Sequence, residues 1–343
     1  MESLEAFIAS QIQWRFVRLV GRGTTALYVA LRALSLRDGP GEVILPDVIC
    51  SNVLDAVLLA GYTPIFANVE RDRFMLDMTN VRQQITASTR AVVTAHLFGY
   101  TAEIPTYGVP VIEDAVQGLG GSVNGQPVGT LGDVSFTSFN ETKMVGGQGG
   151  VVATDDESLW DAIQHIELAS TDSPSPFAAR GVGGEVNRFN SYNHQLATIR
   201  NSLIRTFDAS PENISRIQAS WGTLAANVSE RNEKARYLRD KLADLPLALP
   251  EIRPGDAIWR YSFIAPNRTA ANWILRHLQL ANLSGSNLYP SLSNIFTQPS
   301  ALASQSFAPN IVNLWVDTAT DQAQLDQAIT IIRSTPWKRL GVT

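Results

Sequence analysis

Cysteine is nearly absent from this 343-residue sequence, which contains only Cys50. A single thiol excludes a disulfide within the chain and favours a reducing compartment. An excess of basic residues is also lacking, because 27 Lys and Arg stand against 32 Asp and Glu, for a net charge of −5. Without a basic field to attract a phosphate backbone, nucleic-acid binding is not expected as the main function.

Long apolar runs are missing as well. The most apolar region, residues 53–69, is interrupted by Asp55, Gly61 and Pro64, so no membrane-spanning segment is expected. The first residues include acids and have no basic stretch before an apolar one, so they do not resemble a signal peptide. We therefore predict a globular, cytoplasmic protein, long enough for one large and one small domain.

Lysine is scarce too: the chain has four lysines against 23 arginines, and Lys143 is the only one among the first 233 residues. Two short apolar runs, residues 109–112 and 134–139, are predicted to be buried strands that end in polar residues. Asp114 and Lys143 would then lie just beyond strand ends, at the edge of an α/β sheet where ligands bind. The pattern predicts an amine and a carboxylate at one binding edge.

The residue types at this edge favour a covalently held aldehyde cofactor. Glycines within residues 146–150 permit a tight turn beside a flat ligand, and Lys143 before them can form a Schiff base. Asp114 is the candidate for keeping a ring nitrogen protonated, so that the ring withdraws electrons. Gln117 is placed to face a ring oxygen and Ser138 to take a phosphate. Taken singly, Asp114 is also compatible with a helix cap, and Lys143 with a solvated side chain.

Four linked motifs in this stretch resemble the DegT/StrS family of sugar aminotransferases, which are fold type I enzymes dependent on pyridoxal 5'-phosphate (PLP). The family pattern is EDxxQ, then GD, SFxxxK and a G[ED]GG-like turn. The matching residues here are Glu113-Asp114-Ala115-Val116-Gln117, Gly132-Asp133, Ser138-Phe139-x-x-x-Lys143 and the turn 146–150. The resemblance implies that Lys143 holds PLP and transfers protons, that Asp114 supports the ring nitrogen, and that Gln117 and Ser138 contact the cofactor.

Further cofactor contacts are implied nearer the N-terminus. Thr24 and Thr25 lie in the first turn of a predicted helix, where free N–H groups and the helix dipole attract anions. This segment resembles the family's SGTxAL, which holds the PLP phosphate, although an ordinary helix start fits equally well. Cys50 stands where the family usually has an aromatic residue stacked on the pyridine ring. It either covers the ring or is simply a small buried residue.

The segment by which a partner subunit completes such sites is degenerate in this chain. In the family, an NxRMxE-like motif contributes to the partner's phosphate pocket. The nearest alignment puts Asn213 where the arginine stands, so Asn213 is a candidate cofactor contact and no phosphate-binding arginine is carried over. Arg180, Arg188 and Asn193 are alternatives, and nothing in the sequence decides among them.

The alternation of strands and helices over residues 17–152 predicts an α/β fold with a mainly parallel sheet wrapped by helices. The resemblance narrows this to a fold type I PLP-transferase. Residues 1–213 are expected to form the large PLP-binding domain, including a long loop region at 171–213. A single long helix over 214–245 would link it to a smaller C-terminal α+β domain at 246–343.

Three more residues lie near these motifs. His96 belongs to a stretch that resembles the family's HLYG, and is either close to the cofactor or a structural histidine bonded to a neighbouring loop. Glu113 is expected to point away from the site, because adjacent residues at a strand end face opposite sides. Tyr289 lies in a turn that resembles a substrate-side loop of the family.

The sequence therefore predicts a homodimeric, PLP-dependent aminotransferase with a shared active site. By resemblance, it moves an amino group from glutamate or glutamine to a keto-sugar, commonly nucleotide-linked. Dehydratase relatives replace the lysine with histidine, so Lys143 argues against that reaction. A lyase, an aminotransferase with a non-sugar acceptor, and a non-catalytic regulatory or scaffold protein of this fold stay open. A Rossmann dehydrogenase is disfavoured because the third glycine of its fingerprint is missing, and no metal site is predicted.

Overall fold

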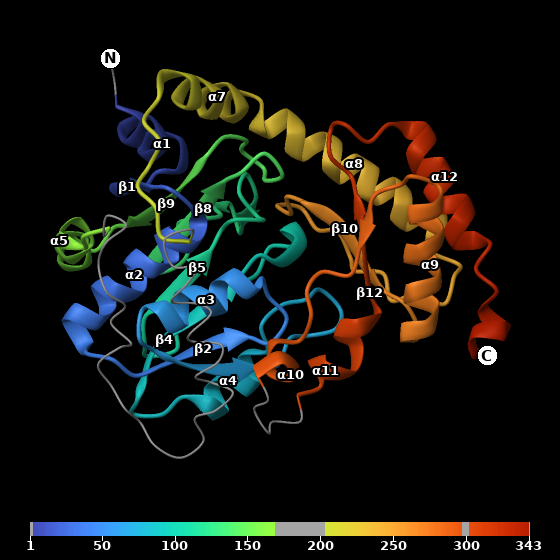
Figure 1. Ribbon diagram of the computed structural model, residues 1–343, viewed down its shortest axis with the longest axis horizontal. Coiled ribbons are helices and arrows are strands. Elements are labelled where there is room, and N and C mark those ends of the chain that lie inside the picture. Colours follow the sequence, from blue (N-terminus) through green and yellow to red (C-terminus); the bar gives the residue numbers. More distant parts are fainter. Residues whose placement is uncertain (1–2, 169–202, 297–301, 343) are drawn as a thin grey trace.

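A seven-stranded sheet forms the centre of the protein, whose computed structural model describes residues 3–168, 203–296 and 302–342 (Figure 1). The strand order is β1-β9-β8-β5-β4-β2-β3. The strands are β1 (Phe16–Val20), β2 (Glu42–Pro46), β3 (Thr63–Ala67), β4 (Thr89–Ala95), β5 (Val111–Asp114), β8 (Val134–Phe139) and β9 (Gly149–Thr154). From β3 to β8 all neighbours are parallel, whereas β9 runs antiparallel to both β8 and β1. The predicted mainly parallel sheet is confirmed.

Apolar side chains cover both faces of this sheet, as parallel sheets require. On β9, Val152 packs with α2, α3 and α5, whereas Val151 and Ala153 pack on the opposite face with α1 and α7. These helices and the neighbouring α4 are α1 (Leu4–Ile12), α2 (Gly23–Asp38), α3 (Ser51–Leu59), α4 (Met78–Gln84), α5 (Glu157–His165) and α7 (Pro211–Gly222). The α/β class expected from the alternating strands and helices follows from this two-sided burial.

A second, three-stranded antiparallel sheet occupies the C-terminal part of the chain (Figure 1). It comprises β10 (Arg260–Ile264), β12 (Ile311–Trp315) and β11 (Gly285–Ser286), in that order. Helix α9 (Arg268–Leu280) packs on it, and α12 (Gln322–Arg333) packs on α9 and on α8 (Leu224–Leu242). The expected α+β arrangement is present, while the exact domain boundaries stay a prediction.

The single helix predicted over residues 214–245 is wrong. Two helices, α7 and α8, occupy this region and meet at Thr223, whose φ of −103° and ψ of 1° are not helical. The break follows Gly222, a residue that weakens helices. The apolar stripe continues across the break through Ile217, Trp221 and Leu224, which is why the pattern alone suggested one helix. Among the described helices, none is both long and apolar enough to span a bilayer.

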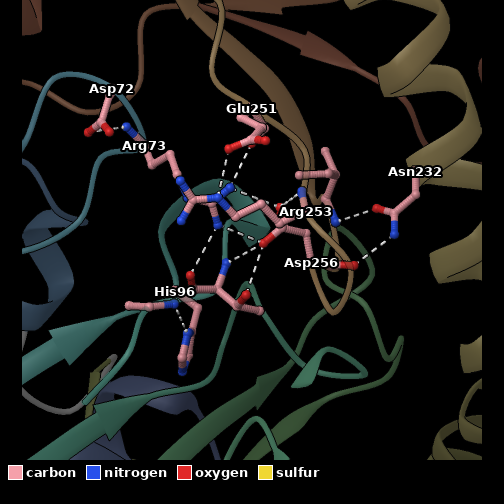
Figure 2. Close-up of polar contacts among 10 residues, drawn as sticks. Asp72, Arg73, His96, Asn232, Glu251, Arg253 and Asp256 are labelled. Carbon is pink, nitrogen blue, oxygen red and sulfur yellow. Dashed lines mark hydrogen bonds and ion pairs between the residues drawn. The ribbon is translucent and has the colours of Figure 1, made fainter. Parts of the chain in front are cut away.

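A buried ion pair joins the first sheet to the segment that leads into β10 (Figure 2). Arg73, in the loop after β3, faces Asp256, with 2.9 Å between Arg73 Nη2 and Asp256 Oδ1 and both side chains at most 5% exposed. Asp256 also accepts hydrogen bonds from the N–H and the hydroxyl of Thr101. On α8, the Asn232 side chain donates to the Asp256 carbonyl oxygen and accepts from the Ile258 N–H. The network fixes the approach to β10 against the first sheet.

Replacing Asp256 by alanine should lower the free energy of unfolding by about 3–5 kcal/mol, because Arg73 would be left buried without its carboxylate. Urea-induced unfolding measured by circular dichroism gives the change. The matched control is Asp244→Ala, which removes an exposed pair with Arg333 and should have a far smaller effect. Equal effects of the two substitutions would contradict the role given to Asp256.

Candidate active site

The carboxyl ends of the parallel strands β5 and β8 bring Asp114 and Lys143 to one edge of the sheet. Asp114 is the last residue of β5 and pairs in register with Phe136 of β8, and Lys143 lies in the turn after β8. Burial raises the pKa of the Cys50 thiol, on which the charges of Lys143 and Asp114 also act in opposite directions. The structure thus gathers Asp114, Lys143 and Cys50 in one place.

Lys143 is held by a short turn and partly covered by an indole ring. Its N–H donates to the Asn140 carbonyl oxygen at 2.7 Å, and its Nζ lies 4.1 Å from the centre of the Trp259 ring. Burial lowers the pKa of Lys143; Asp114 opposes this shift and the positive charge of Arg260 adds to it. A larger share of this amine is therefore neutral, and able to take up a proton, than of a solvated lysine.

Asp114 is a buried carboxylate with few hydrogen-bond donors. It is 6% exposed, and its Oδ1 accepts a hydrogen bond of 3.0 Å from the Val116 N–H. Burial raises the pKa of Asp114 to about 6, and the Val116 N–H and the charge of Lys143 offset this only in part. At neutral pH the group is ionised but poorly hydrated, so a cation beside it would be strongly stabilised. A protonated ring nitrogen is such a cation.

Glu113 faces away from this place, as the strand alternation predicts. The Ala102 N–H donates to His96 Nδ1, so the His96 proton lies on Nε2, which donates to Glu113 Oε1 at 2.9 Å. Burial alone would raise the pKa of Glu113, but hydrogen bonds from His96 and from the N–H groups of Gly129 and Leu131 hold it below its usual range. Of the two roles expected for His96, these contacts support that of a structural histidine bonded to a neighbouring loop.

Gln117 lies beside Tyr289, which belongs to the turn that resembles a substrate-side loop of the family. Its Oε1 accepts from the Phe98 N–H at 2.8 Å, and its Nε2 donates to the Tyr289 hydroxyl at 3.2 Å. Tyr289 stacks on Phe98 with 5.9 Å between ring centres. Burial raises the pKa of Tyr289, and the charges of Cys50 and Asp114 raise it further. Gln117 and Tyr289 thus form one wall next to Asp114, and the predicted contact of Gln117 with a ring oxygen stays a prediction.

The start of α2 and the side chain of Ser138 face each other. A Cβ at Gly23 would lie 2.8 Å from Ser138 Cβ, so this close approach requires glycine. Thr24 is buried in the first turn of α2, where N–H groups have no partner within a helix. The Thr25 hydroxyl donates to the Leu203 carbonyl oxygen at 2.8 Å and thus holds a neighbouring segment. Contact of Thr24, Thr25 and Ser138 with a phosphate stays a prediction.

Asn213 is bound to the glycine turn that follows Lys143. Its Oδ1 accepts from the Gln148 N–H, and its Nδ2 donates to the carbonyl oxygens of Gln148 and Asp208, each at 2.8 Å. Within its own chain Asn213 therefore stabilises this turn, and its predicted cofactor contact stays a prediction. Arg180, Arg188 and Asn193 lie outside the described residues.

A cavity of about 560 Å³ opens beside Lys143. The turn after β8, the adjoining ends of α7 and α8, the start of β10 and the segment after β12 form its walls. Trp259, Arg260 and Trp315 contribute to the lining, although no motif pointed to them. Only the pairing of β10 with β12, which places Arg260 opposite Trp315, brings these residues together.

Comparison with known proteins shows which family the chain matches. The DegT/DnrJ/EryC1/StrS aminotransferase family matches residues 1–333. The UDP-N-acetyl-3-dehydro-alpha-D-glucosamine 3-aminotransferase of Acidithiobacillus ferrooxidans is 32% identical over 243 residues, which are 68% of this chain and 59% of that protein. The match therefore spans less than two thirds of the relative's length.

Solved structures show the same fold at low sequence identity. DesI, crystallised in the presence of its TDP-sugar product, superposes with a TM-score of 0.79 at 22% identity, covering 98% of this chain and 85% of that one. Spr1654 from Streptococcus pneumoniae, a putative sugar aminotransferase in its PMP form, superposes with a TM-score of 0.77 at 17% identity, covering 98% and 91%. The predicted fold class is confirmed.

Proposed function

The chain belongs to the DegT/DnrJ/EryC1/StrS aminotransferase family, and on this premise we propose that it is a PLP-dependent aminotransferase that moves an amino group from glutamate or glutamine to a nucleotide-linked keto-sugar. The observation that carries the proposal is the placement of Lys143 and Asp114 at one sheet edge, with the pKa of the amine lowered and that of the carboxyl raised by burial. The relative from A. ferrooxidans is named for amino transfer to a UDP-linked dehydro-sugar, and DesI was solved with a TDP-sugar product. Both names support a nucleotide-linked acceptor.

The residues at this edge fit PLP. The close contact of Gly23 with Ser138 puts a hydroxyl beside free N–H groups of a helix start, which suits a phosphate. Asp114 offers a buried carboxylate to the ring nitrogen, and Lys143 offers an amine with a lowered pKa to the aldehyde. When bound, PLP would supply an electron sink that weakens the bonds at the α-carbon of an amino acid.

Two residues of the chain would then carry the proton chemistry. With the cofactor bound, the Lys143 amine, whose pKa burial lowers, would accept the proton from the α-carbon of the donor and deliver it to the C4' atom, as general base and then general acid. Asp114 is ionised above a pH of about 6 and would keep the ring nitrogen of the bound cofactor protonated. Gln117 and Tyr289 hold the wall beside Asp114 through their mutual hydrogen bond.

A second copy of the chain is part of the proposal. Enzymes that this sequence resembles share each active site between two subunits, and Asn213, the residue aligned with the family's phosphate-binding arginine, is engaged with its own chain. We therefore propose a homodimer in which the partner supplies the remaining contacts. A cytoplasmic location, favoured by the single cysteine, is proposed with it.

Purified protein incubated with PLP tests the function. We expect an absorbance band of the lysine-bound cofactor that borohydride removes, together with 2-oxoglutarate formation when glutamate and a panel of nucleotide-linked keto-sugars are added. A band without amine transfer to any panel member would indicate a different PLP reaction. Neither band nor transfer would indicate a non-catalytic protein of this fold and would contradict the proposal.

A further inference from the structure

Four of the six charged side chains in the wall of the cavity beside Lys143 are bound to protein partners. The pairs are Glu141 with Arg216, Glu230 with Lys234, Asp317 with Ala319 and Thr320, and Arg231 with Asn227 and Trp259. The side chains of the other two, Lys143 and Arg260, make no hydrogen bond or ion pair with any residue that the structure describes. Both are basic side chains, and the acids in the wall are already bound to protein partners.

Arg260 is held in place by two indole rings. Its Cζ lies 4.2 Å from the centre of the Trp259 ring and 3.2 Å from the centre of the Trp315 ring. Arg260 is 6% exposed, and within the described parts of the chain its Nε and Nη1 have no hydrogen-bond partner. The guanidinium is therefore fixed in position while its donors stay free.

A buried arginine whose donors have no hydrogen-bond partner does not stabilise the fold through those donors. A buried donor without a partner costs about 1–3 kcal/mol, and more when it is charged. Burial lowers the pKa of Arg260 to about 10, so the group still carries its charge at neutral pH. The planar guanidinium with free N–H groups matches the paired oxygens of a carboxylate or phosphoryl group. These observations indicate an anionic ligand.

We propose that Arg260 is the oxyanion-binding residue of this cavity and holds a carboxylate or phosphoryl group of a substrate that reacts at Lys143. Lys143 Nζ and Arg260 Cζ lie 4.1 and 4.2 Å from the centre of the same Trp259 ring, so the reacting amine and the anion site share one indole as a neighbour. An amino-acid donor carries carboxylates and a nucleotide-linked acceptor carries phosphoryl groups, so both have the required chemistry. That the ligand is a substrate rests on the proposed function, whereas oxyanion binding by Arg260 does not.

Calorimetric titration of the PLP-loaded protein with glutarate and with pyrophosphate, at constant ionic strength, tests this site. Arg260→Met should weaken the Kd of at least one probe by about 10- to 100-fold, because a charge-assisted pair is lost. The control is Arg276→Met, an exposed arginine of α9 outside this cavity, which should leave both Kd values unchanged. Loss of glutarate binding alone assigns the site to the donor carboxylate, and loss of pyrophosphate binding alone assigns it to the phosphoryl group of the acceptor. If neither probe binds, or Arg260→Met binds both as the wild type does, the site is refuted.

The thermal stability of the same variants separates binding from a structural role. Arg260→Met should unfold at the wild-type temperature or above it, because the substitution removes an unpaired buried charge. A lower unfolding temperature with unchanged probe binding would make Arg260 structural and refute the proposal. Arg260→Lys keeps the charge without the planar fork. If the Met variant does not fold, weakened binding by a stable Lys variant supports the site, and unchanged binding refutes it.

The oxyanion site and the proposed function can be refuted separately. A wild-type protein that transfers no amine but binds a probe through Arg260 would refute the aminotransferase proposal alone. A protein that transfers amine, but whose probe binding is unchanged by Arg260→Met, would refute the oxyanion site alone.

Discussion

The Lys143→Ala protein is expected to bind PLP without a borohydride-sensitive band and to lose turnover by about 10⁴-fold. Lys143 is the lysine at the sheet edge that carries Asp114, whereas the other three lie on α8 and in the 3₁₀ turn Trp337–Leu340. No described lysine is therefore placed to take over its proton transfer. Absorbance spectra and 2-oxoglutarate formation from glutamate measure the two effects.

Lys241→Ala is the matched control for this substitution. Lys241 is exposed on α8, remote in sequence from the candidate motifs, so its removal should leave both the spectrum and the rate unchanged. Turnover of Lys143→Ala at the rate of the wild type would refute the assignment of Lys143 as the cofactor-bearing amine.

Asp114→Asn is expected to keep the fold and to lose activity by roughly 100-fold or more. An amide has no charge to hold the proton on a ring nitrogen, and removing one partner of a buried ion pair costs about 3 kcal/mol or more, which corresponds to that factor in rate. The rate of amine transfer at saturating glutamate measures the loss. An unaffected rate would reassign Asp114 to the local cap that its hydrogen bond with Val116 forms.

The cofactor-free protein provides a separate test of the same buried charge. Folding raises the pKa of Asp114 to about 6, so ionisation opposes folding. The resulting decrease in the free energy of unfolding is absent below a pH of about 4. It grows as the pH rises to about 6 and stays constant at higher pH. Since one pKa unit corresponds to about 1.4 kcal/mol, Asp114→Asn should gain about 3 kcal/mol relative to wild type above pH 6. A difference in unfolding free energy that does not change with pH would show that Asp114 is not a desolvated charge.

Much of the fold was predictable because buried strands and helices show a local pattern of apolar residues in the sequence. The strand over residues 134–139 has the predicted bounds. The strand predicted over residues 109–112 lies at Val111–Asp114, so Asp114 is its last residue and does not lie beyond its end. The opposite orientations of Glu113 and Asp114 also follow from the alternation of side chains along a strand. The prediction of one helix over 214–245 was wrong, because an apolar stripe reports which face is buried and does not reveal a break at Thr223.

The sequence by itself determined the family, the mainly parallel sheet and the meeting of Asp114 with Lys143, because parallel strands end at one edge whatever their loops do. Only the tertiary structure decided which side chains the distant residues contact at that edge. Tyr289 reaches Gln117 from the C-terminal half, and Trp315 covers Arg260 through strand register. Such partners are selected by packing between elements far apart in the chain, and the local spacing of residues carries no information about that packing.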